Sequence, residues 1–153
     1  MEWSGGSDQM EESKVLVLDA SVIVKWFNEE DYSDLAVKIR DFYIEELLEI
    51  EVPELMFYEV GNALRYNPNF GIEDVARALR DLEDLQLITH PLRGKLAELT
   101  SECAFRYGLT LYDSAYVALA LLRRTTYYTA DEDVVNRVSA PLVKHISEFK
   151  MSP

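Results

Sequence analysis

Short apolar runs alternate along this chain with longer stretches in which apolar residues recur every three or four positions. The first pattern is typical of buried strands and the second of helices with one buried face. The expected strands cover 14–18, 50–53, 87–89, 126–129 and 142–146, and the expected helices cover 20–27, 33–47, 54–65, 72–82, 92–107, 112–123 and 131–138. Strands that alternate with helices predict an α/β fold whose parallel sheet is covered by helices on both faces.

Breaks between these elements are marked by turn residues. Residues 67–71 (NPNFG) separate two helices, Gly108 is placed to end another in the left-handed conformation, and Ser33 or Asp34 could cap the helix that they begin. No linker divides the chain. We therefore expect one domain over 14–149, a leader over 1–13 rich in serine, glycine and acids, and a short tail over 150–153.

Charge narrows the functions that the domain can have. The 153 residues include 28 acidic and 15 basic side chains, giving a net charge of −13, and only four of the acids lie in 1–13. Such a chain does not hold nucleic acid by bulk attraction for phosphates. The acids either cover solvated helix faces or partly converge on a cation. No apolar run is long enough to cross a bilayer and residues 1–13 lack a secretory pattern, which favours a cytoplasmic protein.

Cysteine and histidine chemistry is poorly supported. Cys103 is the only cysteine, which excludes an internal disulfide, and it falls at helical spacing with Leu96 and Leu99. We expect a buried, unreactive thiol. With His90 and His145 the only histidines, the sequence does not indicate a zinc site or a Cys/His nucleophile.

Three aspartates stand where chemistry is often found in α/β proteins. Asp19 follows the first expected strand (LVLDASVIV), Asp131 follows the fourth (YTADEDVV), and Asp113 begins an apolar helix (LTLYDSAYVALA). Each could simply cap a helix and interact with its dipole. Capping does not exclude metal binding, however, and the carboxyl ends of parallel strands form the functional edge of such folds.

Glu59 is the fourth candidate, because it lies among apolar neighbours in PELMFYEVGNAL. It is either on an exposed helix edge or buried, and a buried carboxylate needs a partner. Several carboxylates that converge in one crevice repel one another unless a cation is present. An all-oxygen site of this kind suits Mg²⁺ or Mn²⁺.

These four segments, in this order and spacing, resemble the PIN-domain family and in particular its VapC toxin ribonucleases. The resemblance extends from Val15 to about Phe149. It implies a three-layer α/β/α sandwich with a mostly parallel sheet. It also implies a Mg²⁺- or Mn²⁺-dependent endoribonuclease whose catalytic and metal-binding residues are Asp19, Glu59, Asp113 and Asp131.

The resemblance also assigns supporting residues and partners. Ser21 and Thr129 match polar positions beside the acidic set, while Glu132 and Asp133 could supplement Asp131. Candidate contacts to the RNA backbone are Lys25, Arg65, Arg123 and Arg124. The implied partners are an RNA substrate, a small antitoxin and a second copy of the chain in a homodimer. Aromatic residues that could line a partner groove, or lie in the core, are Trp26, Phe27, Phe42, Tyr43 and Phe57.

Several alternatives stay open at this point. The domain could be a catalytically silent binding or scaffold module, or an RNA-processing PIN nuclease outside a toxin–antitoxin pair. A phosphoryl-accepting receiver domain would need paired acids after the first strand, and a haloacid-type phosphatase would need an aspartate where Ser21 stands. The compact nuclease is the best fit.

Overall fold

The computed structural model describes residues 14–151, so the expected leader at 1–13 and the end of the tail lie outside the described residues. The strands are β1 (Lys14–Leu18), β2 (Leu48–Pro53), β3 (Ile88–His90), β4 (Thr126–Thr129) and β5 (Val143–His145). The helices are α2 (Ala20–Ile23), α3 (Ser33–Ile44), α4 (Leu55–Arg65), α5 (Ile72–Leu85), α6 (Gly94–Tyr107), α7 (Leu111–Arg123) and α8 (Glu132–Val138), with 3₁₀ turns η1 (Val24–Trp26) and η2 (Ile146–Glu148).

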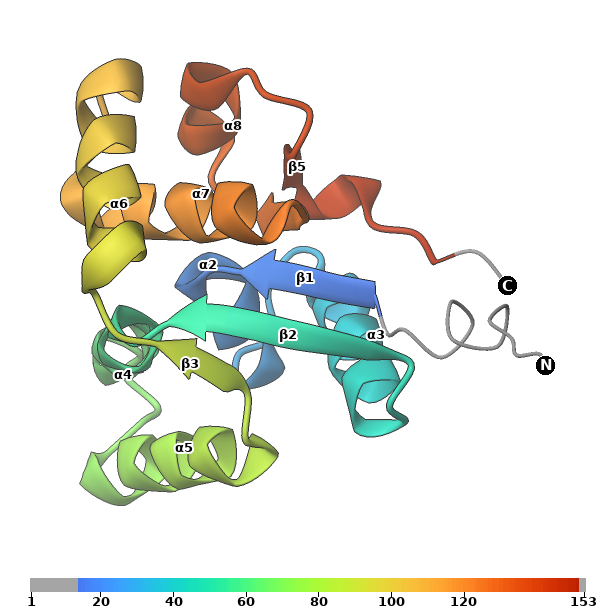
Figure 1. The fold of residues 1–153 in the computed structure, drawn as a ribbon. Helices are drawn as coiled ribbons and strands as arrows, with labels where there is room; N and C mark the ends of the chain where they lie inside the picture. Colours follow the sequence, from blue (N-terminus) through green and yellow to red (C-terminus); the bar gives the residue numbers. More distant parts are fainter. Residues whose placement is uncertain (1–13, 152–153) are drawn as a thin grey trace, which may run out of the picture.

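All five strands belong to one sheet in the order β3-β2-β1-β4-β5, and every neighbouring pair is parallel. α7 packs against β1, β2 and β4, and α6 packs on α7, whereas α3 packs against β2 and α2 against β4. In Figure 1, α6, α7 and α8 lie above β1, β2 and β3, and α4 and α5 lie towards the bottom. The predicted three-layer arrangement is therefore confirmed. Because every neighbouring pair is parallel, the carboxyl ends of the strands gather at one edge; the arrowheads of β1, β2 and β3 mark this edge in Figure 1.

The core forms where β1 and α7 cross the middle of the molecule. Leu16, Val17 and Leu18 of β1 are fully buried, and α7 is buried without interruption over residues 114–120. This burial agrees with the apolar character of the expected helix on nearly all its faces. Cys103 is also buried, as predicted. Within the described residues, no helix is long and apolar enough to cross a membrane.

One predicted helix start is wrong. Neither Ser33 nor Asp34 caps α3, because its N-cap is Tyr32, which has a left-handed backbone (φ 68°) and makes no side-chain capping bond. The Ser33 hydroxyl instead donates to the carbonyl of Asn28 at 3.0 Å and accepts from the amide of Glu30 at 2.8 Å. Gly108, by contrast, ends α6 in the predicted left-handed conformation at φ 65°.

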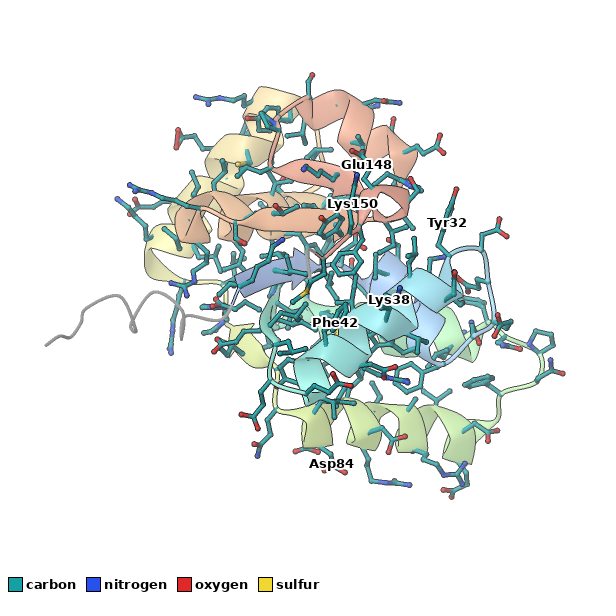
Figure 2. All side chains as sticks on the ribbon, turned by 90° about the vertical axis from the view of Figure 1, so that its right-hand side faces the viewer. Tyr32, Lys38, Phe42, Asp84, Glu148 and Lys150 are labelled. Atoms are coloured by element: carbon teal, nitrogen blue, oxygen red, sulfur yellow. The ribbon has the colours of Figure 1, made fainter. Side chains whose placement is uncertain are left out.

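Most of the aromatic residues considered for a partner groove serve the core. The Trp26 indole donates to the carbonyl of Ala36 at 2.8 Å, and the Tyr43 hydroxyl donates to that of Leu85 at 2.6 Å. Phe42 packs against Phe149, with ring centroids 6.3 Å apart, on the face of the molecule shown in Figure 2. Phe27 is partly buried and packs against the core as well. Phe57 also lines the groove between α4 and α5, and Tyr43 lines a separate cavity of about 500 Å³.

Candidate active site at the carboxyl edge of the sheet

Asp19 is held at the end of the central strand. It is the N-cap of α2, where its Oδ1 accepts from the amide of Ser21 at 3.0 Å and from the Ser21 hydroxyl at 2.5 Å. Its Oδ2 accepts from the hydroxyls of Tyr127 at 2.5 Å and Thr129 at 2.6 Å on the neighbouring strand β4. Burial raises the pKa of Asp19, while these hydrogen bonds oppose the rise by stabilising the carboxylate.

Ser21 and Thr129, the two predicted supporting residues, both contact Asp19 and also tie it to the β4–α8 connection. The Ser21 hydroxyl accepts from the amide of Ala130 at 2.9 Å, and the Thr129 hydroxyl accepts from the amide of Asp131 at 3.0 Å. Two strand ends therefore share one hydrogen-bond network. The network fixes Asp131 in relation to Asp19 through the backbone as well as through side chains.

Glu59 reaches the same region from α4. It is half-buried, and its Oε1 accepts from the hydroxyl of Tyr116 on α7 at 2.7 Å. Burial raises the pKa of Glu59, the Tyr116 hydrogen bond lowers it, and the negative charges of Asp19 and Asp113 raise it further. The charge effects place these three carboxylates within electrostatic reach of one another.

Asp113 and Asp131 complete the acidic set from two helix starts. Asp113 lies in the first turn of α7 and does not cap it, because the N-cap is Thr110, whose hydroxyl accepts from the amide of Asp113 at 3.0 Å. Burial raises the pKa of Asp113, as do the charges of Asp131 and Asp19. Asp131 is exposed and caps α8 by accepting from the amide of Asp133 at 3.0 Å. We call Asp19, Glu59, Asp113 and Asp131 the acidic cluster.

Two tyrosines that the sequence analysis missed connect the members of this cluster. Tyr116 donates to Glu59, Tyr127 donates to Asp19, and their rings are stacked with centroids 5.7 Å apart and an interplanar angle of 20°. Both rings are buried. The spacing could have indicated them. Tyr127 lies two positions before Thr129 on β4, and Tyr116 lies three positions after Asp113 on α7, so each tyrosine shares a face of its element with a predicted site residue.

Comparison with known proteins bears directly on this arrangement. The family model described as PIN domain matches residues 16–140, which contain the whole acidic cluster. The chain belongs to the PIN-domain family. A curated relative, Ribonuclease VapC3 of Pyrobaculum aerophilum, is 32% identical over 109 residues, which cover 69% of this chain and 80% of that protein.

Solved structures share the fold of this PIN domain at lower sequence identity. PAE2754 from Pyrobaculum aerophilum superposes with a TM-score of 0.60 at 20% identity, covering 88% of this chain and 85% of that chain. A toxin–antitoxin complex from Klebsiella pneumoniae gives 0.65 at 18% identity, over 88% and 99%. FitAcB from Neisseria gonorrhoeae gives 0.63 at 16% identity, over 88% and 99%. At such identities the likeness concerns the fold.

The side chains of the acidic cluster offer the type of ligand atom that a hard divalent cation prefers. All four cluster side chains offer carboxylate oxygens, and three of them have pKa values that burial, with neighbouring acids in two cases, shifts upward. Among residues 14–151, however, no three acidic, histidine or cysteine side chains lie close enough together to ligate one ion. Mg²⁺ commonly binds through one or two carboxylates and several waters, which agrees with this looser arrangement.

The four basic residues predicted to guide RNA occupy different environments. Lys25 is buried and pairs with Glu30 at 3.2 Å. Arg123 pairs with the buried Glu51 at 2.9 Å. It is the last residue of α7, whereas Asp113 lies in the first turn of that helix, so the two residues are about 15 Å apart along the helix axis. The adjoining Arg124 ends α7 in the left-handed conformation.

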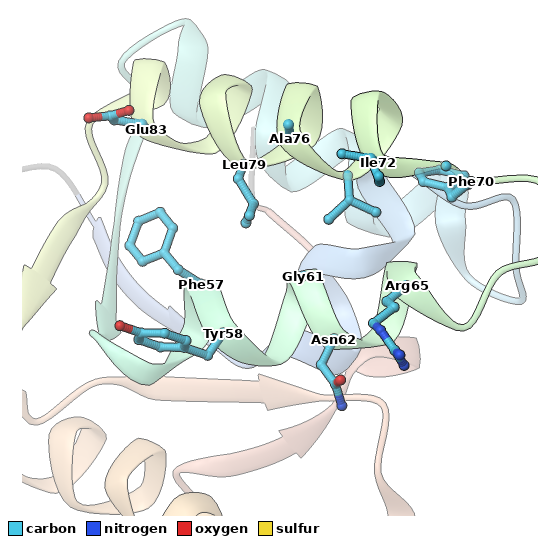
Figure 3. Close-up of a pocket in the computed structure, with 12 residues that line it drawn as sticks. Phe57, Tyr58, Gly61, Asn62, Arg65, Phe70, Ile72, Ala76, Leu79 and Glu83 are labelled. Atoms are coloured by element: carbon cyan, nitrogen blue, oxygen red, sulfur yellow. The ribbon is translucent and has the colours of Figure 1, made fainter.

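Arg65 is the fourth of these basic residues, and it is exposed. Its guanidinium lies 5.3 Å from the centroid of the Tyr66 ring. It is also one of the residues that line the groove between α4 and α5 in Figure 3. Whether any of the four basic residues contacts RNA stays a prediction.

Proposed function

We propose that this PIN domain is a divalent-metal-dependent endoribonuclease that hydrolyses RNA phosphodiesters, and that it is the toxin of a toxin–antitoxin pair. One observation carries the proposal. Asp19, Glu59 and Asp113 come from three separate elements, and burial or mutual repulsion raises the pKa of each. A fold gains no stability from gathering like charges, so the arrangement is best explained by a cation that binds there.

The mechanism that we propose is direct attack of water on the phosphorus, with loss of the leaving oxygen and no covalent intermediate on the protein. Mg²⁺ or Mn²⁺ held by the acidic cluster would lower the pKa of the attacking water and neutralise charge on the phosphoryl group. The chain's own part is positioning. Ser21, Tyr127 and Thr129 fix Asp19, while Tyr116 fixes Glu59.

The antitoxin would bind in the groove between α4 and α5. This groove has a volume of about 1040 Å³ and is lined mainly by apolar side chains, among them Phe57, Ile72 and Leu79 (Figure 3). Ile72 is 87% exposed, and a large apolar side chain exposed beside an apolar groove is typical of a surface that binds another protein. The net charge of −13 favours a basic partner segment with an apolar face. A homodimer is the assembly that we expect for the toxin.

A cleavage assay tests the nuclease. Short single-stranded RNAs are incubated with the protein in Mg²⁺, in Mn²⁺ and in EDTA. We expect cleavage that requires the cation and that falls by at least about a hundredfold in Asp19→Asn. Asp41→Asn is the matched control, because Asp41 is an exposed aspartate of α3 outside the cluster. If the protein cleaves RNA with neither metal, the alternative of a catalytically silent binding module is favoured. If Asp19→Asn cleaves as fast as the unaltered protein, the proposed site is refuted.

A binding assay tests the partner. We expect the product of a small reading frame next to this gene to bind the protein and to suppress cleavage. Ile72→Glu should weaken that complex by about tenfold or more without changing the cleavage of RNA by the free protein. A complex of unchanged affinity would show that the partner binds elsewhere. Cleavage without any such neighbouring gene would indicate an RNA-processing nuclease outside a toxin–antitoxin pair.

A further inference from the structure

A small apolar pocket lies next to the acidic cluster and is not explained by the cleavage chemistry. Its volume is about 190 Å³, and it opens where α4, α6 and α7 begin, just beyond the ends of β2 and β3. Its walls include Tyr58, Tyr112, His90, Leu92, Leu96 and Leu111. The pocket therefore combines aromatic and aliphatic walls with the imidazole of His90 and the carboxylate of Glu54.

Two tyrosines in the pocket wall are sequence neighbours of cluster residues. Tyr58 immediately precedes Glu59, and Tyr112 immediately precedes Asp113. Their side chains are 77% and 66% exposed, so neither contributes much to the core. Large exposed aromatic rings beside a site are typical of surfaces that stack on a planar ligand.

The imidazole of His90 is held in place by a hydrogen bond to Glu51. Its Nε2 lies 2.7 Å from Oε1 of Glu51, a carboxylate that is buried in β2. The other Glu51 oxygen accepts from Arg123, at 3.0 Å from Nε and 2.9 Å from Nη2. Because an ionised carboxylate can only accept, Nε2 carries a proton, and in the neutral form of the ring Nδ1 is then the acceptor. Nδ1 makes no hydrogen bond within residues 14–151.

We propose that this pocket binds an unpaired nucleobase of the RNA substrate, adjacent to the phosphodiester that is cleaved. The base would stack on Tyr58 and Tyr112 and donate a hydrogen bond from its edge to Nδ1 of His90. This inference rests on the proposed nuclease function and adds a determinant of sequence preference. The net charge supports it, because an acidic protein gains little from phosphate attraction and must derive affinity from base stacking.

The test uses the full chain carrying Asp19→Asn, so that binding is measured without cleavage. Four RNA dodecamers, each with one base type, and an RNA containing the fluorescent base 2-aminopurine serve as probes. Stacking is worth about 1–3 kcal/mol per base, so Tyr112→Ala and Tyr58→Ala should each weaken binding by about 5- to 150-fold. Tyr112→Phe should retain the affinity. Phe105→Ala, which removes a 92% exposed ring outside the pocket, is the control.

Sequence preference gives a second readout, with Asp19 intact. Among the four dodecamers, we expect His90→Leu to narrow the differences in cleavage rate, because each base presents its edge donor to Nδ1 in a different position. We also expect quenching of 2-aminopurine on binding, which is lost in Tyr112→Ala. Unchanged affinity and preference in all these variants would overturn the base pocket. The cation-dependent cleavage by the unaltered protein would still stand, so the two proposals fail separately.

One further outcome concerns the assembly. If Tyr58→Ala and Tyr112→Ala change the mass of the protein measured by light scattering but leave RNA affinity unchanged, this face is an interface between copies of the chain. That result would also overturn the base pocket. Both side chains are largely exposed, so we expect the variants to fold, and their melting temperatures should stay within about 2 °C of the unaltered protein.

Discussion

The hydroxyl of Tyr116 donates a hydrogen bond to Oε1 of Glu59 at 2.7 Å and thereby joins α7 to α4 across the site. This bond lowers the pKa of Glu59, against burial and the neighbouring charges that raise it. Its donor is a buried ring that also stacks on Tyr127, the tyrosine that holds Asp19. The positions of two acidic residues therefore depend on one pair of aromatic side chains.

Tyr116→Phe should shift the pH dependence of cleavage. Without the hydroxyl, the carboxylate of Glu59 loses stabilisation and its pKa rises, so the acidic limb of the profile moves to higher pH. A hydrogen bond to a charged group is worth about 1.5–3 kcal/mol, which corresponds to about a tenfold loss or more on the acidic limb. The measurement is kcat/KM against pH. Tyr43→Phe, which removes a hydroxyl that bonds only to backbone, should leave the limb in place.

Thr129→Val should reduce both stability and activity. The substitution keeps the shape of a fully buried side chain but removes a donor to Asp19 and the acceptor of the Asp131 amide. Unsatisfied buried polar groups cost about 1–3 kcal/mol, which urea unfolding will detect. Thr129→Ser restores the hydroxyl and should recover most of the activity. Equal activity in the valine and serine variants would show that the hydroxyl does not position Asp19.

Asp113→Asn should stabilise the metal-free protein at neutral pH. The pKa of Asp113 is raised in the folded state above its ordinary value of 3.8, by burial first and then by Asp131 and Asp19. The folded state therefore favours the protonated carboxyl of Asp113, and the free energy of unfolding falls as pH rises from about 3.8 through the folded-state pKa. In EDTA at pH 7 we expect a gain of up to about 1 kcal/mol, or about 2–4 °C in Tm. At pH 3 the difference from the unaltered protein should vanish.

Divalent cations should reverse this penalty. We propose that Mg²⁺ or Mn²⁺ binds the ionised carboxylates of the folded state. The free energy of unfolding should therefore rise with cation concentration, by about 2.7 kcal/mol at a hundred times the Kd, and the melting temperature should rise with it. Asp19→Asn should abolish most of that rise, whereas Asp41→Asn should not. Calorimetry in Mn²⁺ and in Ca²⁺ makes the comparison. A rise of equal size in the Asp19 variant would place the ion elsewhere.

The buried Glu51 gives a prediction about stability alone. Arg123→Leu leaves its carboxylate in β2 with His90 as the remaining partner, and breaking a buried pair costs about 3–5 kcal/mol. Because Arg123 is itself 46% exposed, we expect the low end of that range. The double variant Glu51→Gln/Arg123→Leu removes the stranded charge and should be more stable than Arg123→Leu. Denaturant unfolding of both variants will decide.

The sequence predicted the layers of the fold because periodicity and burial agree in most of the elements. It also predicted that Asp19 and Asp131 lie at the same edge of the sheet, since parallel strands bring their carboxyl ends together. It did not reveal Tyr116 and Tyr127, whose hydroxyls matter only through contacts between residues up to 108 positions apart. Glu51 was missed for a similar reason, because its two partners come from β3 and α7. The start of α3 was wrong because a tyrosine adopts the left-handed conformation there.

The strand order has a consequence for when this enzyme can act. β1 precedes the other strands of residues 14–151 in the sequence, yet its place in the sheet is between β2 and β4, and Asp19 receives hydrogen bonds from residues 108 and 110 positions later. The acidic cluster is therefore incomplete until residue 131 has been synthesised. A nascent chain that stops before residue 131 lacks one of the four carboxylates, so it cannot assemble the active site that we propose.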